Sequence, residues 1–239
     1  MVDTALPTRL FCMSLEAVTP KKGEVAFVWF NNYAGVTIRT PTKTLVVDPA
    51  AIDPKVFKAV DAILVTHEHS DHLDEGIIRD VHTRTHCLVA ADSTSAKRLK
   101  DSVSGDKLFE MRVGREIKIG NVTVRAESFK HPAATPVSYL ITTEDRIRIY
   151  HTGDSLPHPD MKQLGDRNPP DIVFCTVGPP APRASPQSGL EIVRMVKPKM
   201  AVPYHAPVAN LQKFAELLAK ESSAVKCLVI SQNKPAKYP

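Results

Sequence analysis

One short segment concentrates the side chains of this chain that could do chemistry. Residues 66–72 read Thr-His-Glu-His-Ser-Asp-His, which places three imidazoles and one carboxylate within six positions, at His67, His69, Asp71 and His72. Such crowding is most readily made favourable by a divalent cation, because imidazole and carboxylate are common metal ligands. The alternative is a polar turn with solvated histidines. We favour a metal site, since histidine ligates metals so often.

The position of the segment supports this interpretation. The apolar run Ala62–Val65 predicts a short buried strand, so the loop follows its carboxyl end, where open α/β sheets place their ligands. His67 and His69 are two residues apart in extended chain and point the same way, so they can hold one ion. Asp71 and His72 come where the chain turns into a helix predicted from near Leu73. They can therefore face a neighbouring ion.

Three later residues complete the candidate site, namely His131, Asp154 and His205. Each follows a predicted strand, at 122–128, 146–150 and 200–202 respectively. Because strand ends converge on one edge of a layered fold, these side chains can reach the first segment. Together the residues supply five imidazoles and two carboxylates, enough for two ions with one carboxylate bridging and positions left for water. Open positions favour catalysis over a structural metal site.

The elements that must position these residues alternate between two patterns. The strands predicted at 24–30, 35–39 and 44–47 would form an antiparallel meander. From residue 62 onward, strands alternate with helices, as in the strand predicted at 87–90 and the helix predicted at 93–100. A β-rich block covers 116–150. The last third returns to alternation, with strands at 172–175, 200–202 and 227–230 and helices at 187–196 and 211–220. Two mixed β-sheets that pack against each other, with helices on the outside, would bury the apolar faces of both sheets in a sandwich.

Length and composition indicate one ordinary globular domain. The 239 residues, 43% of them hydrophobic, suit a single domain over 1–239, with about 1–23 and 233–239 peripheral. No apolar run is long enough to span a membrane, and the first fifteen residues lack a basic start followed by an apolar stretch. Residues Cys12, Cys87, Cys175 and Cys227 are far apart and suit free thiols. We therefore expect a soluble, cytoplasmic protein without a membrane partner.

Charge narrows the class of partner. The net charge of +5 is mild, and the basic residues are scattered rather than gathered in a dense tract. A nucleic-acid partner is therefore not expected, whereas a small anionic substrate is compatible with this pattern.

The ordered pattern has a family resemblance. The residues His67-x-His69-x-Asp71-His72, then His131, Gly153-Asp154 and His205, with Asp48-Pro49 after a strand, resemble the metallo-β-lactamase superfamily. The similarity covers about Glu24–Ile230. It is greatest to the small single-domain metal-dependent hydrolases that include the L-ascorbate-6-phosphate lactonases. The resemblance implies an α/β fold of the α+β type, a four-layer αββα sandwich of two mixed sheets flanked by helices.

The resemblance also implies roles for individual residues. His67, His69 and His131 would hold the first ion, Asp71, His72 and His205 the second, and Asp154 would bridge them. Asp48 would orient the metal loop by hydrogen bonds from outside the ligand set. The cofactors expected are two divalent metal ions, with zinc favoured and manganese or iron as alternatives. Members of this branch tend to assemble, so a homo-oligomer is also expected.

The metal pair leads to a mechanism. Two cations would lower the pKa of a shared water and supply hydroxide, and Asp71 or Asp154 would orient it and accept its proton. His151 would donate a hydrogen bond to a substrate oxygen, or else be a satisfied, partly buried histidine. Arg183 and Lys130 could contact an anionic substrate group. The expected enzyme is a metal-dependent, lactonase-like hydrolase that cleaves an ester, lactone or phosphoester bond in a small, anionic substrate.

Departures from the superfamily narrow the function, and alternatives stay open. Some subclasses that hydrolyse β-lactams carry a cysteine where Asp154 stands, and others have no carboxylate there, so antibiotic hydrolysis is not expected. The stretch from Asp154 to His205 accommodates two strands and a helix but no inserted nuclease domain. The alternatives are a phosphodiesterase or nuclease-type phosphoester hydrolase, a mononuclear iron oxygenase, and a non-catalytic metal-binding module on the same fold.

Overall fold

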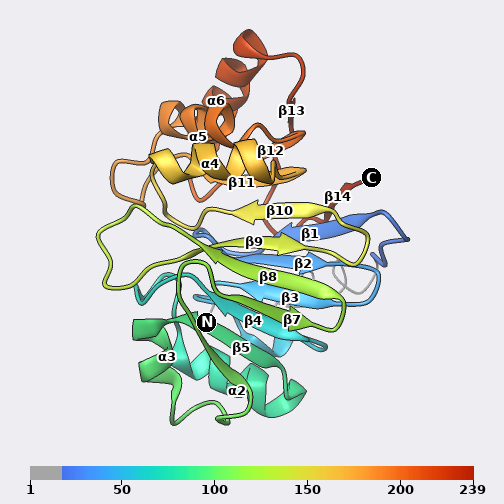
Figure 1. Cartoon of the computed structure of the whole chain (residues 1–239), viewed down its shortest axis with the longest axis vertical. Helices are drawn as coiled ribbons and strands as arrows, with labels where there is room; N and C mark the ends of the chain where they lie inside the picture. The colour runs from blue at the N-terminus through green and yellow to red at the C-terminus, as the bar shows by residue number, and fades with distance from the viewer. Residues whose placement is uncertain (1–17) are drawn as a thin grey trace, which may run out of the picture.

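The structure, a computed structural model, describes residues 18–239 and contains two mixed seven-stranded β-sheets packed face to face (Figure 1). The first sheet runs in the order β14 (Ala236–Tyr238), β1 (Val25–Trp29), β2 (Val36–Arg39), β3 (Thr44–Val47), β4 (Ala62–Val65), β5 (Leu88–Asp92) and β6 (Leu108–Met111). It is antiparallel from β14 to β3 and parallel from β3 to β6.

The second sheet has a similar organisation. Its order is β13 (Lys226–Cys227), β12 (Met200–Tyr204), β11 (Ile172–Thr176), β10 (Arg148–His151), β9 (Ser138–Thr142), β8 (Val122–Glu127) and β7 (Glu116–Ile119). Strands β13 to β10 are parallel, and β10 to β7 are antiparallel. The two parallel halves place several carboxyl strand ends at the same edge of the sandwich, which is where ligand sites form in such sheets.

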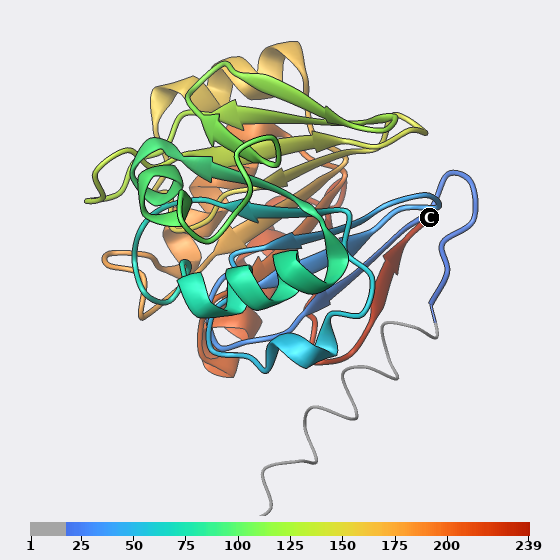
Figure 2. The same ribbon diagram turned by 90° about the horizontal axis from the view of Figure 1, so that it is seen from below.

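Helices cover the outer face of each sheet (Figures 1 and 2). The first sheet carries the 3-10 turn η1 (Pro54–Val56) and the helices α2 (Glu75–Thr85) and α3 (Ser93–Leu99), and the second carries α4 (Pro159–Arg167), α5 (Pro186–Val196) and α6 (Val208–Glu221). The four-layer αββα sandwich with two mixed sheets is therefore confirmed. Among residues 18–239, every helix is too short or too polar to cross a membrane.

Strand β4 shows why the apolar run before the histidines is continuous. Its residues are fully buried, with Ala62 and Leu64 in the core between the sheets and Ile63 and Val65 in the core under the helices. A strand buried on both faces has no polar alternation. This strand holds the start of the histidine loop rigidly.

Several elements differ from the sequence prediction. Strand β6 and helix α4 were not predicted, so two helices rather than one lie between Asp154 and His205. The tail at 233–239 was expected to be loosely held, but Ala236–Tyr238 pairs with β1, so that expectation is wrong for these residues. The last predicted strand shortens to Lys226–Cys227. Cys12 and the expectations for 1–17 lie outside the described residues, whereas Cys87, Cys175 and Cys227 are free thiols, as predicted.

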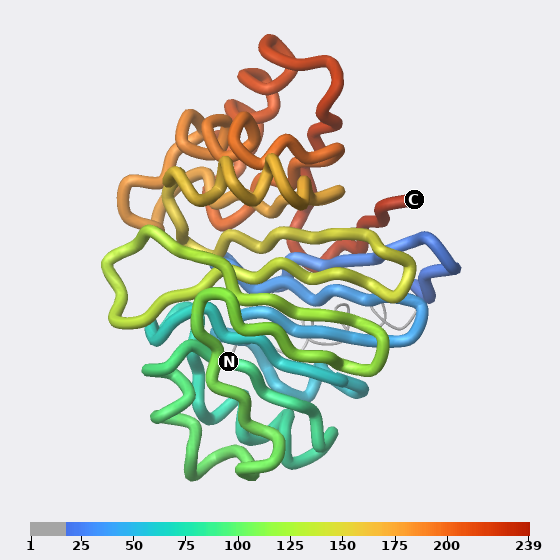
Figure 3. The backbone as a smooth tube through the Cα atoms, in the orientation of Figure 1, coloured from blue at the N-terminus to red at the C-terminus, as the bar shows by residue number. Residues whose placement is uncertain are grey.

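The connections that follow the strands gather at one end of the sandwich. Figure 3 shows the yellow-green loop around 128–137 and the orange loop around 177–186 on the same side of the molecule. Every candidate ligand predicted from the sequence follows a strand that ends on this side, after β4, β8, β10 or β12.

Candidate metal centre

The histidine loop is anchored by a buried aspartate, Asp48, at the end of β3. One oxygen of Asp48 accepts the Thr66 backbone N–H at 2.8 Å, and the other accepts the Thr66 hydroxyl at 2.8 Å. That second oxygen also accepts Nδ1–H of His72 at 2.8 Å. The opposite ring nitrogen of His72 is thereby directed toward the candidate site. This is the orienting contact that the family resemblance implied for Asp48.

Asp48 keeps this position at a conformational cost. Its φ is 48°, in the left-handed region that aspartate and asparagine tolerate better than most residues. His205 has a similar φ of 52° at the end of β12. Such backbone strain, of order 1–3 kcal/mol per residue, concentrates at functional sites.

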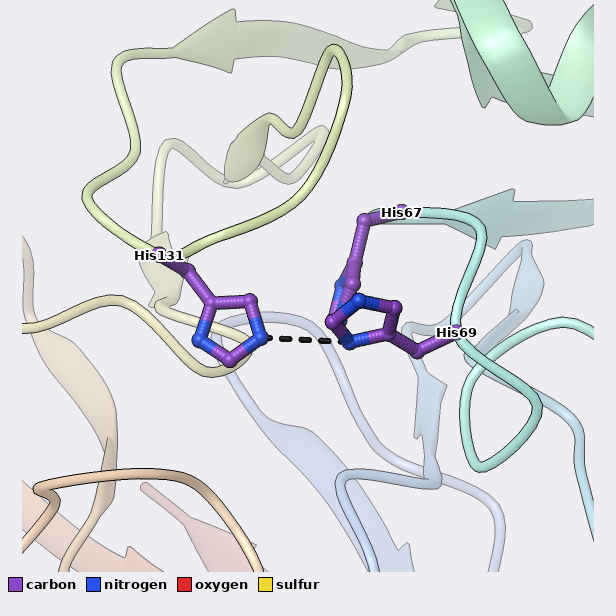
Figure 4. A group of neighbouring side chains, drawn as sticks. All are labelled: His67, His69 and His131. Atoms are coloured by element: carbon purple, nitrogen blue, oxygen red, sulfur yellow. Dashed lines mark hydrogen bonds between the residues drawn. The ribbon is translucent and has the colours of Figure 1, made fainter.

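Three histidines form the first ligand cluster, which Figure 4 shows with the rings turned toward one another. Nε2 of His67 lies 3.1 Å from Nδ1 of His69, and Nε2 of His131 lies 3.2 Å from the same atom. A tetrahedral zinc ion with nitrogen ligands at about 2.0–2.1 Å holds those nitrogens about 3.4 Å apart. The spacing in the cluster therefore fits a shared metal ion.

The second cluster combines two carboxylates and two histidines, Asp71, His72, Asp154 and His205, whose ligand atoms lie within 4.8 Å of one another. Oδ1 of Asp154 is 2.8 Å from Nδ1 of His205 and 3.4 Å from Nε2 of His72. Oδ2 of Asp71 is 3.6 Å from the same His72 nitrogen. The structure thus brings together all seven predicted ligand residues, in the two groups that the resemblance implied.

Asp154 lies between the two clusters. While its Oδ1 faces His72 and His205, its Oδ2 lies 3.9 Å from Nε2 of His131 in the first cluster. A carboxylate with one oxygen toward each group is placed as a bridging ligand would be.

Buried atoms without partners test whether a metal fits. Nε2 of His72, Oδ1 of Asp154 and both ring nitrogens of His205 are buried and form no hydrogen bond with any described residue. Although Nδ1 of His205 lies 2.8 Å from Oδ1 of Asp154, the two groups are not oriented as a hydrogen bond requires. Each such atom costs about 1–3 kcal/mol when unsatisfied, and cations at the two clusters would satisfy them. The donor set therefore fits divalent metal ions.

The protonation states of His67, His131 and Asp154 suit metal ligation. Burial lowers the pKa of His67 far below its usual value and lowers the pKa of His131, so both imidazoles are neutral. Burial alone would lower the pKa of His72, but the carboxylates of Asp154 and Asp48 outweigh it and raise that pKa well above normal. Burial opposes ionisation of Asp154, yet His72 and His205 hold its pKa well below normal. The second cluster therefore carries an ionised carboxylate.

Some supporting residues were not predicted. The Phe129 ring packs on His67 and His131, with centroids 5.6 and 6.0 Å apart, and the Tyr33 ring meets His205 edge-on at 5.9 Å. The Glu68 carboxylate accepts the Ala134 N–H at 2.8 Å and so holds the loop after His131. Glu68 carried a sequence signal through its place inside the histidine segment, whereas the position of the Phe129 ring results from tertiary packing.

The two interpretations of His151 are resolved by its surroundings. The side chain is fully buried, Nε2 donates to the Ala34 carbonyl at 3.0 Å, and Nδ1 accepts the Gly153 N–H at 3.3 Å. Burial lowers the pKa of His151 to about 4, so the ring is neutral. Because both nitrogens are satisfied inside the protein, the substrate contact is wrong and the buried structural histidine is correct. Lys130 and Arg183 are exposed, and their contacts with substrate stay predictions.

The fold and the paired clusters define a protein of the metallo-β-lactamase type. The chain belongs to the β-lactamase superfamily, since residues 29–206 match the family model described as the beta-lactamase superfamily domain. A UPF0173 protein of Pyrococcus abyssi is 31% identical over 181 residues, covering 74% of this chain and 81% of the relative. A UPF0173 metal-dependent hydrolase of Polynucleobacter asymbioticus is 25% identical, covering 91% and 87%.

A solved structure shows the same fold. The metallo hydrolase Igni18 of the archaeon Ignicoccus hospitalis superposes with a TM-score of 0.77 at 16% identity, covering 90% of this chain and 99% of that one. The αββα architecture is thus shared far beyond the level at which sequences stay similar.

Proposed function

We propose that this protein is a metal-dependent hydrolase that cleaves an ester, lactone or phosphoester bond in a small anionic substrate. The observation that carries the proposal is the pair of adjoining clusters, with Asp154 directing one oxygen toward each. The relatives described as metal-dependent hydrolases support it. When bound, two divalent cations would supply a Lewis acid and lower the pKa of a water toward neutrality.

The chain's own residues divide the remaining work. His67, His69 and His131 would hold one cation, while Asp71, His72 and His205 would hold the second and Asp154 would bridge. Asp71 is the ligand of the second cluster that is most open to solvent, at 24% side-chain exposure, so it can orient an incoming water and accept its proton. The Asp48 carboxylate fixes His72, and the rings of Phe129 and Tyr33 wall the site.

The finer assignments belong to the same proposal. We favour zinc, with manganese or iron as alternatives, because histidine and aspartate ligands suit all three. The buried free thiols Cys87 and Cys175 suit a reducing compartment such as the cytoplasm. The partner is a small-molecule substrate rather than nucleic acid, and assembly with further copies of this chain is compatible with it.

The proposal is tested by measuring metal content and turnover on the same protein preparation. Protein purified without chelators is analysed for metal and assayed on lactones, aryl esters and bis(p-nitrophenyl) phosphate, which separates the lactonase from the phosphodiesterase alternative. His69→Ala should reduce bound metal and lower turnover by on the order of 100-fold or more, since several kcal/mol of transition-state stabilisation depend on the metal. The matched control is His86→Ala, which changes an exposed histidine at the end of α2.

Other outcomes would select other functions. One iron per chain with oxygen uptake would point to the mononuclear oxygenase, although the complete second cluster argues against it. Tight metal retention without turnover on any of these bonds would indicate a binding module. Full turnover by metal-stripped protein would refute the proposal.

A further inference from the structure

A cavity of about 570 Å³ opens beside the metal centre. Its lining comes from the ends of three strands and from one loop: Ser93 follows β5, Arg112 and Val113 follow β6, Phe129 follows β8, and Thr135 belongs to the loop after His131. We call this cavity the lateral pocket. None of its lining residues is a candidate metal ligand, so it is a separate feature of the same edge.

The lateral pocket shares a wall with the metal centre. The Phe129 ring lines the pocket and also packs on His67 and His131. In the first sheet the pocket lies at the ends of β5 and β6, whereas His67 follows β4. Neighbouring strands are about 4.8 Å apart, so the far side of the pocket lies about 10 Å from the metal loop, measured across two strands. A substrate that fills both places must be elongated.

The wall formed by the loop after His131 is fixed in place. The Thr135 hydroxyl donates to Asp92 at 2.6 Å and accepts the Thr94 N–H at 2.9 Å. Asp92 is itself buried at the end of β5 and caps α3. This wall of the pocket is therefore formed before any ligand arrives, which reduces the entropy lost on binding.

The charges around the pocket favour an anion. Two cations, Lys97 and Arg112, line it. Arg112 is paired with Glu110 at 2.7 Å, and the same carboxylate accepts the Ser93 hydroxyl at 2.6 Å. Lys97 is exposed and forms no salt bridge with any residue in 18–239, so its ammonium group remains available to an anionic ligand. A positive rim attracts anions and steers them to the cavity.

Apolar surface completes the chemistry of the pocket. Val113 is 60% exposed, one of only three large hydrophobic side chains with much exposure in the described chain, and it lines the cavity together with Phe129. An exposed apolar side chain beside a cavity suggests a surface that a ligand covers.

We propose that the lateral pocket binds an apolar extension of the substrate that ends in a carboxylate or phosphate about 10 Å from the bond cleaved. Lys97 contacts that anionic group, and Phe129 and Val113 pack against the apolar body. The inference rests on the proposed hydrolase function and deepens it, because it specifies the shape and charge of the substrate.

The experiment compares two esters of equal length on the metal-loaded protein. One is 4′-acetoxybiphenyl-4-carboxylate, whose carboxylate lies about 10 Å from the ester oxygen, and the other is the neutral 4′-acetoxybiphenyl-4-carboxamide. The anionic ester should have a kcat/KM about 3- to 10-fold higher, the effect expected of one partly exposed charged contact. A phosphonate in place of the carboxylate shows which anion the pocket prefers.

Two lysines of one segment provide the variant and its control. Lys97→Ala should abolish the preference for the anionic ester, mainly through KM. Lys100→Ala removes another exposed charge, at the end of the same helix and outside the pocket lining, and should retain the preference. If both esters are hydrolysed equally well, or if Lys97→Ala keeps the preference, the lateral pocket inference is overturned while the hydrolase proposal stands.

A binding measurement tests the lateral pocket in the case that neither ester is hydrolysed. If neither ester is hydrolysed, calorimetric titration with 4′-hydroxybiphenyl-4-carboxylate decides between the two ideas. Binding that weakens about 3- to 10-fold in Lys97→Ala but not in Lys100→Ala supports the pocket even though ester cleavage has failed. Absence of binding to the metal-loaded protein overturns it.

Discussion

At the scale of single residues, the position of Asp154 depends on the glycine before it. Gly153 has a φ of +54°, which side chains other than glycine adopt with strain, and it lies against the Phe129 ring. A Cβ at position 153 would lie 2.8 Å from Cε2 of Phe129 and 3.3 Å from Cβ of Thr66. Phe129 has little freedom to retreat, since its ring packs on His67 and His131.

Gly153→Ala should therefore disturb both stability and the site. We expect the free energy of unfolding to fall by about 1–3 kcal/mol, from backbone strain and overpacking, with turnover falling as Asp154 shifts. Thermal unfolding and kcat/KM are measured on the same preparation. Gly105→Ala is the control, because nothing lies within 4 Å of its added Cβ. Equal unfolding temperatures for the two variants would contradict this account.

A second residue-scale prediction concerns Asp48. Asp48→Asn keeps the size and tolerates the φ of 48°, but it replaces one acceptor oxygen by an amide that cannot accept both Thr66 Oγ1–H and His72 Nδ1–H. His72 should then be held less firmly, with a loss of about 10- to 100-fold in metal affinity. Competition with a chromophoric chelator measures this loss. The control is Asp53→Asn, at the exposed start of η1, which should bind metal as tightly as the unaltered protein. If Asp48→Asn also binds metal that tightly, Asp48 does not orient His72 for metal binding.

At the scale of elements, one aspartate joins a helix to the loop that carries His131. Asp92 accepts the Thr94 N–H at 2.9 Å at the start of α3 and the Thr135 hydroxyl at 2.6 Å. Burial raises the pKa of Asp92 above its usual value, and the hydrogen bonds from Ser95 and Thr135 offset only part of that rise. The ionised carboxylate thus opposes folding while its hydrogen bonds order the loop.

The raised pKa predicts a pH dependence with a defined sign. In the unfolded chain Asp92 titrates near pH 4, and in the folded protein it titrates higher, so the folded state binds more protons between those values. The stability contributed by this group falls as pH rises through that window and is constant above it. Asp92→Asn keeps a capping side chain without titrating.

Urea unfolding from pH 4 upward measures this effect. The stability of the unaltered protein relative to Asp92→Asn should decline with rising pH and then level off. Asp106→Asn, at an exposed position, serves as the control and should show no such trend. A difference between Asp92→Asn and the unaltered protein that is independent of pH would show that burial does not perturb Asp92.

At the scale of the whole molecule, the sequence predicted the architecture wherever the core is built from strands that are apolar without interruption. Strands such as β4 and β11 are buried throughout, so their residues are apolar without interruption. The seven clustered ligands were found for a related reason, because each follows a predicted strand and parallel strand ends meet at one edge. The local residue pattern and the sheet topology were enough to predict these ligands.

The elements that were missed depend on contacts far away in the chain. Helix α4 buries only Met161, Leu164 and Gly165 among nine residues, so its period is hard to recognise. Strand β14 has three residues and exists because β1, more than 200 positions earlier, offers an edge. The shared Phe129 wall and the buried state of His151 likewise result from tertiary packing. No local pattern encodes them.

The metal centre also connects the two halves of the sandwich. His67 to His72 follow β4 of the first sheet, whereas His131, Asp154 and His205 follow β8, β10 and β12 of the second. Each ligand cluster contains residues from both sheets, so bound cations would link the sheets at this edge. Metal that binds only the folded state stabilises it in proportion to the logarithm of its concentration.

Removal of metal should therefore destabilise the whole fold and not just the loops. At a free metal concentration 1,000-fold above the dissociation constant, one site adds about 4 kcal/mol, which corresponds to about 10 °C in Tm for a domain of this size. Calorimetry is run on loaded and chelated protein, with elemental analysis of both, and zinc addition should restore the loaded value. His69→Ala should show a smaller shift, because its first cluster is incomplete. If chelated and loaded protein unfold at the same temperature, the clusters do not hold metal across the two sheets.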